Sequence, residues 1–140
     1  MTRMIQLKLK EGCAQVFVRL SLENPSTGAR NIVDAKIDTG AIVTIIPMDC
    51  VSGMGFEIVG ESVFTAANGE PLHTYVTNAI LSLSDEDELE TPIYLVKNNS
   101  SLPLIGMDFL SQCNFAQWHE SENGAHTLHF EIETFKEETS

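Results

Sequence analysis

Basic residues are scarce in this chain of 140 residues, which has eight Lys and Arg against 20 Asp and Glu. The formal net charge is therefore −12 at pH 7. Nucleic-acid-binding proteins neutralise phosphates with clustered basic side chains, and no basic cluster exists here, so nucleic acid is excluded as a partner. Much of the acidity lies in residues 84–90 and 131–138. We interpret these runs as a solvated loop and tail, and the alternative is an acidic field that favours neutral or basic substrates.

Long apolar runs and paired cysteines are also missing. No stretch reaches the length of about 20 apolar residues that a membrane-spanning helix needs. Residues 1–10 alternate apolar and basic side chains and lack the continuous apolar core of a signal peptide. The three cysteines, an odd number at irregular spacing, do not form a disulfide framework. We therefore expect a cytoplasmic protein with free thiols and without a membrane partner.

The chain is organised around residues 33–47, where apolar and β-branched side chains flank Asp38, Thr39 and Gly40. We expect a strand, a tight loop and a second strand. A plain surface turn is the alternative, since all three residues favour turns, but a surface turn rarely has both arms in a core. The positions expected to be buried on the two sides are Ala35, Ile37, Ile42, Val43, Ile45 and Ile46.

Asp38 is then a carboxylate presented from a rigid apolar frame, which is more typical of catalysis than of packing. Such a carboxylate loses part of its hydration, so its charged form needs backbone N–H donors. Gly40 allows the main chain to come close enough to supply them.

Residues 38–41 read Asp-Thr-Gly-Ala, and this stretch resembles the signature of the retropepsin-like aspartic proteases. A second signature of that family is an apolar pair followed by Gly and a short helix. It is matched by Leu104, Ile105 and Gly106 and the residues after them. The order and separation of the two signatures agree, and the resemblance covers roughly residues 32–115.

The resemblance implies a mainly β fold, a closed retropepsin-like acid-protease β-barrel or sandwich with one or two short helices and one active-site loop per chain. At 140 residues with 43% hydrophobic content, the chain suffices for a single domain. Within it, residues 1–31 are expected to supply N-terminal strands and 32–115 the core with catalytic loop, flap and Gly106 motif. A C-terminal hairpin over 116–135 and a frayed tail over 136–140 complete the prediction.

The implied activity is that of an aspartic endopeptidase that needs no cofactor. Two carboxylates share a proton, and together they activate a water and protonate the peptide carbonyl. The chain has one Asp-Thr-Gly and no second Asp-Thr-Gly or Asp-Ser-Gly, so the second Asp38 must come from another copy. We therefore predict a homodimer with the site on its two-fold axis, acting on a polypeptide substrate. The resemblance implies that the Thr39 hydroxyl forms a hydrogen bond across that axis to the loop of the partner chain.

Ala41 supports the loop but has no hydroxyl to bond the carboxylate, as Ser or Thr at this position has in other aspartic proteases. We therefore expect activity from mildly acidic toward neutral pH.

Retroviral enzymes carry an Arg just after the Gly of the second signature and an acidic residue just beyond Asp-Thr-Gly-Ala, and the two form an ion pair. This chain has Met107 at the first place and Ile42 and Val43 at the second. Both charges are missing together, so neither is left unpaired. The departure favours a cellular, non-retroviral branch of the family.

Between the two signatures, residues 61–67 and 71–83 flank Asn68 and Gly69, a strong hairpin signal. The resemblance places the flap here, closing over bound peptide, with its tip at Ala67, Asn68 and Gly69. An ordinary surface hairpin is the alternative.

The remaining pattern predicts further elements. Strands over 4–9 and 13–22 are expected to pair as a hairpin, followed by a turn over 24–28. A short helix or irregular turn is expected over 48–54 and a strand over 89–96. Strands 115–119 and 126–135 should form a final hairpin, whose last strand is a candidate for sheet pairing between the two copies. These elements are read from the residues of the printed sequence.

Several side chains have simpler expected roles. Cys50 is expected to be a small buried hydrophobe rather than a nucleophile. The pair before Gly106 should pack against the catalytic loop, Gly106 should leave room for the loop backbone, and Asp108 suits the start of a helix. A metal site from His119, His126 and His129 is rejected, because the last two point to opposite faces of a strand.

An extended peptide would bind through backbone hydrogen bonds, with its side chains in alternating pockets. Ile42, Val43 and Ile105 are expected to line these pockets and to favour hydrophobic residues next to the cleaved bond. A function of a different class stays open: a non-catalytic module with this fold that binds peptides or dimerises, because a fold alone does not establish activity.

Overall fold

The computed structural model of the protein describes residues 4–8, 16–66, 68–83, 88–97, 102–122 and 125–133. Its strands are β1 (Met4–Lys8), β2 (Val16–Glu23), β3 (Arg30–Ile37), β4 (Ile45–Pro47), β5 (Gly60–Thr65), β6 (Pro71–Ser82), β7 (Glu88–Val96), β8 (Leu104–Ile105), β9 (Asn114–Glu122) and β10 (Ala125–Glu133). A 3-10 helix, η1, spans Met48–Val51, and a short α-helix, α1, spans Met107–Leu110. Within the described part of the chain, no helix has the length and apolar character needed to cross a membrane.

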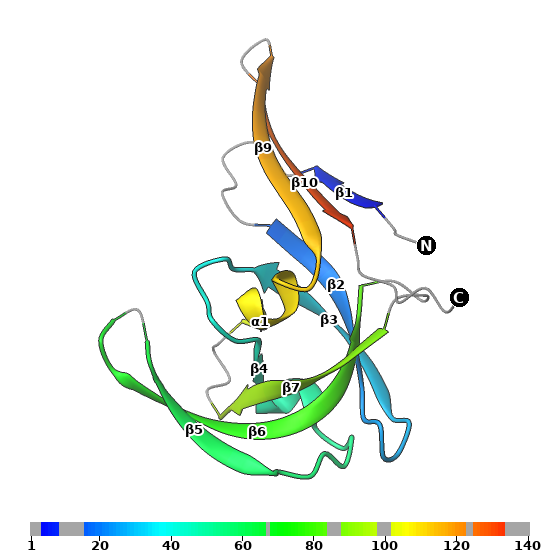
Figure 1. The fold of residues 1–140 in the computed structure, drawn as a ribbon, viewed down its shortest axis with the longest axis vertical. Coiled ribbons are helices and arrows are strands. Elements are labelled where there is room, and N and C mark those ends of the chain that lie inside the picture. Colours follow the sequence, from blue (N-terminus) through cyan, green and yellow to red (C-terminus); the bar gives the residue numbers. More distant parts are fainter. Residues whose placement is uncertain are drawn as a thin grey trace.

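The main sheet closes on itself. Its seven strands run in the order β2-β3-β8-β4-β7-β6-β5. β2 also pairs with β6, so the six strands from β2 to β6 in this order form a closed ring. The result is a barrel from which the β5–β6 hairpin extends (Figure 1). The predicted mainly β, closed-barrel fold with short helices is therefore confirmed.

Alternation along the strands fills the barrel. Successive side chains of a strand point to opposite faces, and burial alternates over residues 17–23 of β2, 77–81 of β6 and 90–95 of β7. Removing these apolar side chains from water is the main favourable term in forming the barrel. The buried residues that these strands contribute to the core are Val18, Leu20, Leu22, Ala79, Leu81, Ile93 and Leu95.

Two parallel pairings bring distant segments together. β3 runs parallel to β8, with Ile37 opposite Ile105, and β4 runs parallel to β7. β8 also pairs with β4 in the antiparallel sense, through Ile45 and Leu104. The strand that leads into Asp38 therefore lies beside the start of the second signature in the same sheet, although the two segments are far apart in the chain.

The chain termini form a second sheet of three strands, in the order β1-β10-β9 (Figure 1). One expectation is corrected here. β1 pairs with β10, with Met4 opposite Glu133, and not with β2 as a hairpin. β10 lies between β9, which pairs with it over residues 125–133, and β1, which pairs with it over residues 129–133. The alternation that predicts a strand does not specify the strand's partner.

The predicted turns and hairpins are present. The chain reverses between β2 and β3 at residues 24–28, where Gly28 has a φ of 76°. The expected short helix after Pro47 is η1. β9 and β10 form the final hairpin, and His126 and His129 both lie on β10, three positions apart. The side chains of this hairpin lie outside the described part of the structure.

Leu22 lies where the barrel closes, opposite Asn31 of β3 and Leu81 of β6, and it is fully buried. Leu22→Ala should lower the free energy of unfolding by about 2–5 kcal/mol, because it removes buried methyl groups and leaves a cavity. Urea denaturation measures the change. Leu102→Ala is the control, since Leu102 is 52% exposed. An equal loss in both variants would contradict this description of the closure.

Candidate active site

The Asp38 loop begins where β3 ends. The backbone N–H of Asp38 donates to the carbonyl of Ile105 (3.0 Å), and the N–H of Ala41 donates back to the carbonyl of Asp38 (3.1 Å). The N–H of Gly40 donates to Oδ1 of the Asp38 carboxylate (2.9 Å), which is a backbone donor of the kind that the sequence predicts. Asp38 is partly exposed, while Thr39 and Gly40 are exposed. The structure thus presents the carboxylate at the surface of a loop fixed at both ends.

Gly106 packs directly against the backbone of the segment that follows Asp38. A Cβ atom at this position would overlap the carbonyl oxygen of Val43 and lie 2.9 Å from the Val43 nitrogen. Gly106 is itself buried. Only a residue without a side chain allows the loop backbone to approach this closely, which agrees with the role expected of Gly106.

The first turn of α1 is bonded to the same loop. The N–H of Met107 donates to the carbonyl of Ala41 (2.8 Å), and the N–H of Asp108 donates to the carbonyl of Ile42 (3.0 Å). The first N–H groups of a helix have no partner within it. Here they are satisfied by the loop, so the helix start and the loop stabilise each other.

Thr44 and Asp108 form a contact that the sequence interpretation missed. The backbone N–H of Thr44 donates to Oδ2 of Asp108 (3.1 Å), and the Thr44 hydroxyl donates to Oδ1 (2.8 Å). Oδ1 also accepts from the N–H of Phe109 (2.8 Å). The helix-start position expected for Asp108 is present, but its carboxylate also reaches the loop. A polar Thr inside an otherwise apolar run was the available signal.

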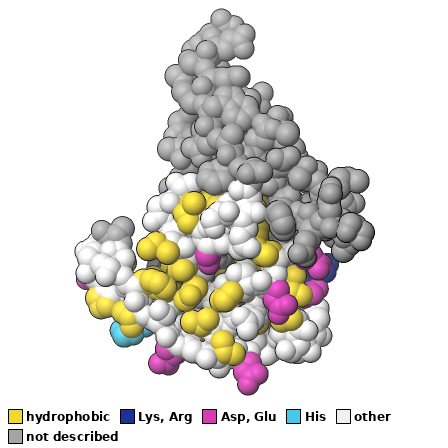
Figure 2. Space-filling model, in the orientation of Figure 1, with side chains coloured by type: hydrophobic (Ala, Val, Ile, Leu, Met, Phe, Trp, Pro, Cys, Tyr) yellow, Lys and Arg dark blue, Asp and Glu magenta, His cyan; other side chains and the backbone are white. Residues whose placement is uncertain are grey.

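The expected burial of the two arms fails next to the loop. Ala35 and Ile37 before the loop and Ile46 after it are buried, whereas Ile42 is 75% exposed, so its expected burial is wrong. Val43 and Ile45 are partly exposed. The backbone of residues 41–44 is tied to α1, and this leaves the Ile42 side chain facing solvent. Ile105 is fully buried and belongs to the core beneath the loop, so it offers a substrate no surface. Figure 2 shows hydrophobic side chains gathered around an acidic one on one face of the molecule.

The hairpin predicted to serve as the flap is formed by β5 and β6, with Thr65 opposite Pro71. At its end the N–H of Gly69 donates to the carbonyl of Ala66 (2.9 Å), and Gly69 has a φ of 84°. The N–H of Glu70 donates to the side chain of Asn68 (3.0 Å). Asn68 and Gly69 are exposed, and Ala67 lies outside the described residues. The predicted hairpin is present, with the positive φ at the glycine.

An aromatic contact joins this hairpin to the barrel. The rings of Phe64 on β5 and Tyr94 on β7 meet edge to face, with centroids 5.2 Å apart. The backbone N–H of Tyr94 donates to the carbonyl of Thr44 (3.0 Å). β7, which contacts the hairpin through Tyr94, is thus also bonded to the segment that follows Asp38.

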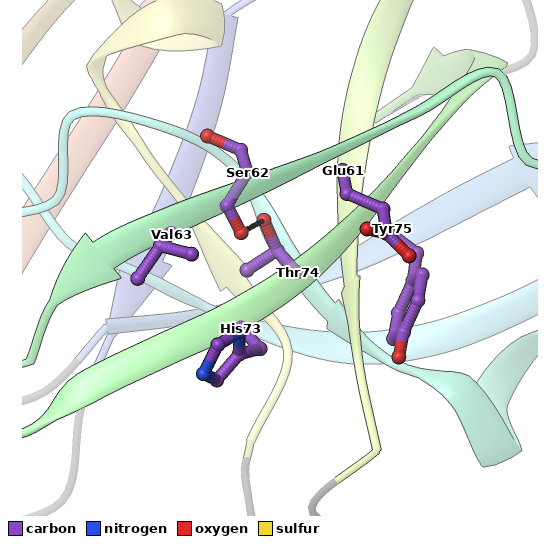
Figure 3. A pocket seen from close by; sticks show the side chains of 6 residues that line it. All are labelled: Glu61, Ser62, Val63, His73, Thr74 and Tyr75. Atoms are coloured by element: carbon purple, nitrogen blue, oxygen red, sulfur yellow. Dashed lines mark hydrogen bonds between the residues drawn. The ribbon is translucent and has the colours of Figure 1, made fainter.

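A hollow lies on the β5–β6 hairpin itself, and Asp38 is not among the residues that line it. Figure 3 shows its lining, in which the Thr74 hydroxyl donates to the carbonyl of Ser62 (3.0 Å). Because the Thr74 hydroxyl is bonded to the neighbouring strand β5, this hydrogen bond stabilises the hairpin. The lining residues are Glu61, Ser62, Val63, His73, Thr74 and Tyr75.

Residues 28–112, more than half of the chain, match the family model described as "gag-polyprotein putative aspartyl protease". The chain belongs to this family of aspartic proteases. No curated protein matches it.

Solved structures that share the fold of this aspartic protease family member include two aspartic proteases. One is a retropepsin-like aspartic protease from Rickettsia conorii, which is 10% identical, with a TM-score of 0.55, and the match covers 94% of this chain and 95% of that one. The other is the EIAV protease complexed with the inhibitor HBY-793. It is 11% identical, with a TM-score of 0.54, and the match covers 69% of this chain and 86% of that one. At such identities the likeness establishes the retropepsin fold alone.

Cys50 of this family member is partly buried and free. Burial, and after it the charge of Asp49 and a hydrogen bond with Asp49, raise the pKa of the Cys50 thiol. A raised pKa leaves little thiolate at neutral pH, so the thiol is a poor nucleophile. This agrees with the expectation that Cys50 packs rather than reacts.

Gly106→Ala should destabilise the fold by about 1–3 kcal/mol, because the new methyl group would force the backbone of Val43 away. Gly60→Ala is the matched control, since a Cβ there would meet only the Cβ of Val76 at 3.9 Å. Urea denaturation of both variants measures the difference. Equal stability of the two would show that the loop backbone does not rest on Gly106.

Proposed function

We propose that the protein is an aspartic endopeptidase, in which the Asp38 carboxylates of two identical chains together hydrolyse a peptide bond. The observation that carries the proposal is the loop geometry. Asp38 is partly exposed, one of its oxygens accepts a backbone N–H, and the loop is bonded to β8 and α1. Membership of an aspartic protease family supports a catalytic role for this carboxylate.

The proposed reaction requires two carboxylates in contact. Two such charges that close cannot both ionise, so the pair holds one proton between them. The ionised carboxylate takes a proton from a water, the water oxygen attacks the peptide carbonyl carbon, and the protonated carboxylate donates to the carbonyl oxygen. Since the chain contains one Asp-Thr-Gly, a homodimer supplies the second group. Thr39 is exposed beside Asp38, where its hydroxyl is available for the bond to the partner loop.

The proposed substrate is an extended polypeptide held between the β5–β6 flap and the Asp38 pair. Ile42 presents an exposed apolar side chain four residues after Asp38, and Val43 is partly exposed next to it. These two residues support a preference for hydrophobic side chains near the cleaved bond. The fully buried Ile105 is no longer part of the proposed pocket.

The proposed place of action is the cytoplasm. Within the described residues, Cys50 is a free thiol, which suits a reducing compartment.

Asp38→Asn should lower the cleavage rate of denatured casein and of a mixed peptide library by about a thousandfold or more, because the dyad loses its ionised carboxylate. Mass spectrometry of the products measures cleavage, and circular dichroism checks that the variant is folded. Equal products from both proteins would remove the protease assignment. Peptide binding without cleavage by either protein would favour a non-catalytic binding module instead.

Mixing the wild-type protein with Asp38→Asn tests the shared site. With a tenfold excess of the variant and random exchange of subunits, activity per wild-type chain should fall to about a tenth, because most wild-type chains then pair with a chain that lacks the carboxylate. Cleavage of a fluorogenic peptide measures the activity. Bovine serum albumin at the same concentration is the control. Undiminished activity after full exchange would contradict the homodimeric mechanism.

A further inference from the structure

Thr44 is a polar residue in the core, with 0% of its surface exposed. Each of its polar groups has a partner. The N–H and the hydroxyl donate to Asp108, the hydroxyl oxygen accepts from the N–H of Gly106 (3.2 Å), and the carbonyl accepts from the N–H of Tyr94. A buried polar group without partners would cost free energy, so this set of bonds has to form as a unit.

These bonds complete a continuous attachment of the catalytic loop. The carbonyls of Ala41 and Ile42 are bonded to the first turn of α1, and the backbone of Val43 rests on Gly106. Thr44 adds the side-chain bonds to Asp108. Every residue from 41 to 44 is therefore held by residues 106–108, and this attachment begins three residues after Asp38.

We propose that Thr44 and Asp108 are positioning residues that set the orientation of the Asp38 carboxylate for catalysis. The inference rests on the proposed endopeptidase function. Neither residue touches the reacting atoms. Catalysis by a carboxylate pair depends on the placement of each group, and a misplacement of about 1 Å can cost a hundredfold in rate.

The chemistry of Asp108 is specific to a carboxylate. Within the described residues, the three groups bonded to its carboxylate are neutral donors: the N–H and hydroxyl of Thr44 and the N–H of Phe109. An amide in its place has one acceptor oxygen and one NH2 group, which only donates. In Asp108→Asn the NH2 group would face at least one of these donors, and the hydrogen bond to that donor would be lost. With Met107 where retroviral relatives carry an Arg, hydrogen bonds to Asp108 join the loop to the helix.

Four variants test the proposal. Thr44→Val and Asp108→Asn break the contact, and Thr44→Ser keeps the hydroxyl. Thr77→Val is the matched control, because Thr77 on β6 is also buried (2% exposed) but donates its hydroxyl to the carbonyl of Glu57 (2.6 Å), outside the contact between the Asp38 loop and α1. The control separates loss of a buried hydroxyl from loss of this particular contact.

The first measurement is amide hydrogen exchange over residues 38–44, which does not depend on activity. Thr44→Val and Asp108→Asn should speed exchange there by about tenfold or more, because the loop opens locally, whereas Thr44→Ser and Thr77→Val should not. Unchanged exchange in both of the first two variants would overturn the proposal.

The second measurement is peptide cleavage at a temperature where all variants are folded. Thr44→Val and Asp108→Asn should lower kcat by about ten- to a hundredfold with KM little changed, and Thr44→Ser should stay within about threefold of wild type. A kcat for Thr44→Val no lower than that of Thr77→Val would overturn the catalytic role. If the wild-type protein cleaves nothing, the proposed function fails, and the exchange measurement still decides whether Thr44 and Asp108 hold the loop.

Discussion

The contact between the Asp38 loop and the β8–α1 segment is the constraint on which the candidate site depends. Backbone groups cannot be buried without partners, and a loop entering a core has no regular sheet to supply them. Here the loop obtains its partners from Ile105, Met107 and Asp108. Gly106 allows the approach because it has no side chain. The same bonds that satisfy the loop also determine where the carboxylate lies.

The closed barrel makes this contact possible. β8 has only two residues and would not be stable alone, but it lies between β3 and β4 in the closed sheet. Its parallel pairing with β3 brings Ile37 opposite Ile105. The buried side chains of β2, β6 and β7 stabilise the ring as a whole, so the rigidity of the loop depends on packing far from Asp38. A mutation in the core and one in the loop can therefore affect the same site.

Sequence interpretation succeeded where local chemistry decides the structure. The alternation of apolar residues predicts the strands, Asn68 and Gly69 predict a hairpin, and the two signatures predict the retropepsin fold. It failed where partners are decided at long range. The pairing of β1 with β10, the exposure of Ile42 and the bonds between Thr44 and Asp108 all depend on segments that are distant in sequence.

The amino-acid sequence by itself determined the class of fold, the family and the candidate carboxylate, because strand alternation, turn residues and the Asp-Thr-Gly-Ala motif are local patterns. Only the tertiary structure decided which strands pair, which apolar side chains face solvent, and which groups hold the Asp38 loop. The physical reason is that a hydrogen bond or a buried contact between distant residues is specified by the closure of the barrel, and no local pattern records it.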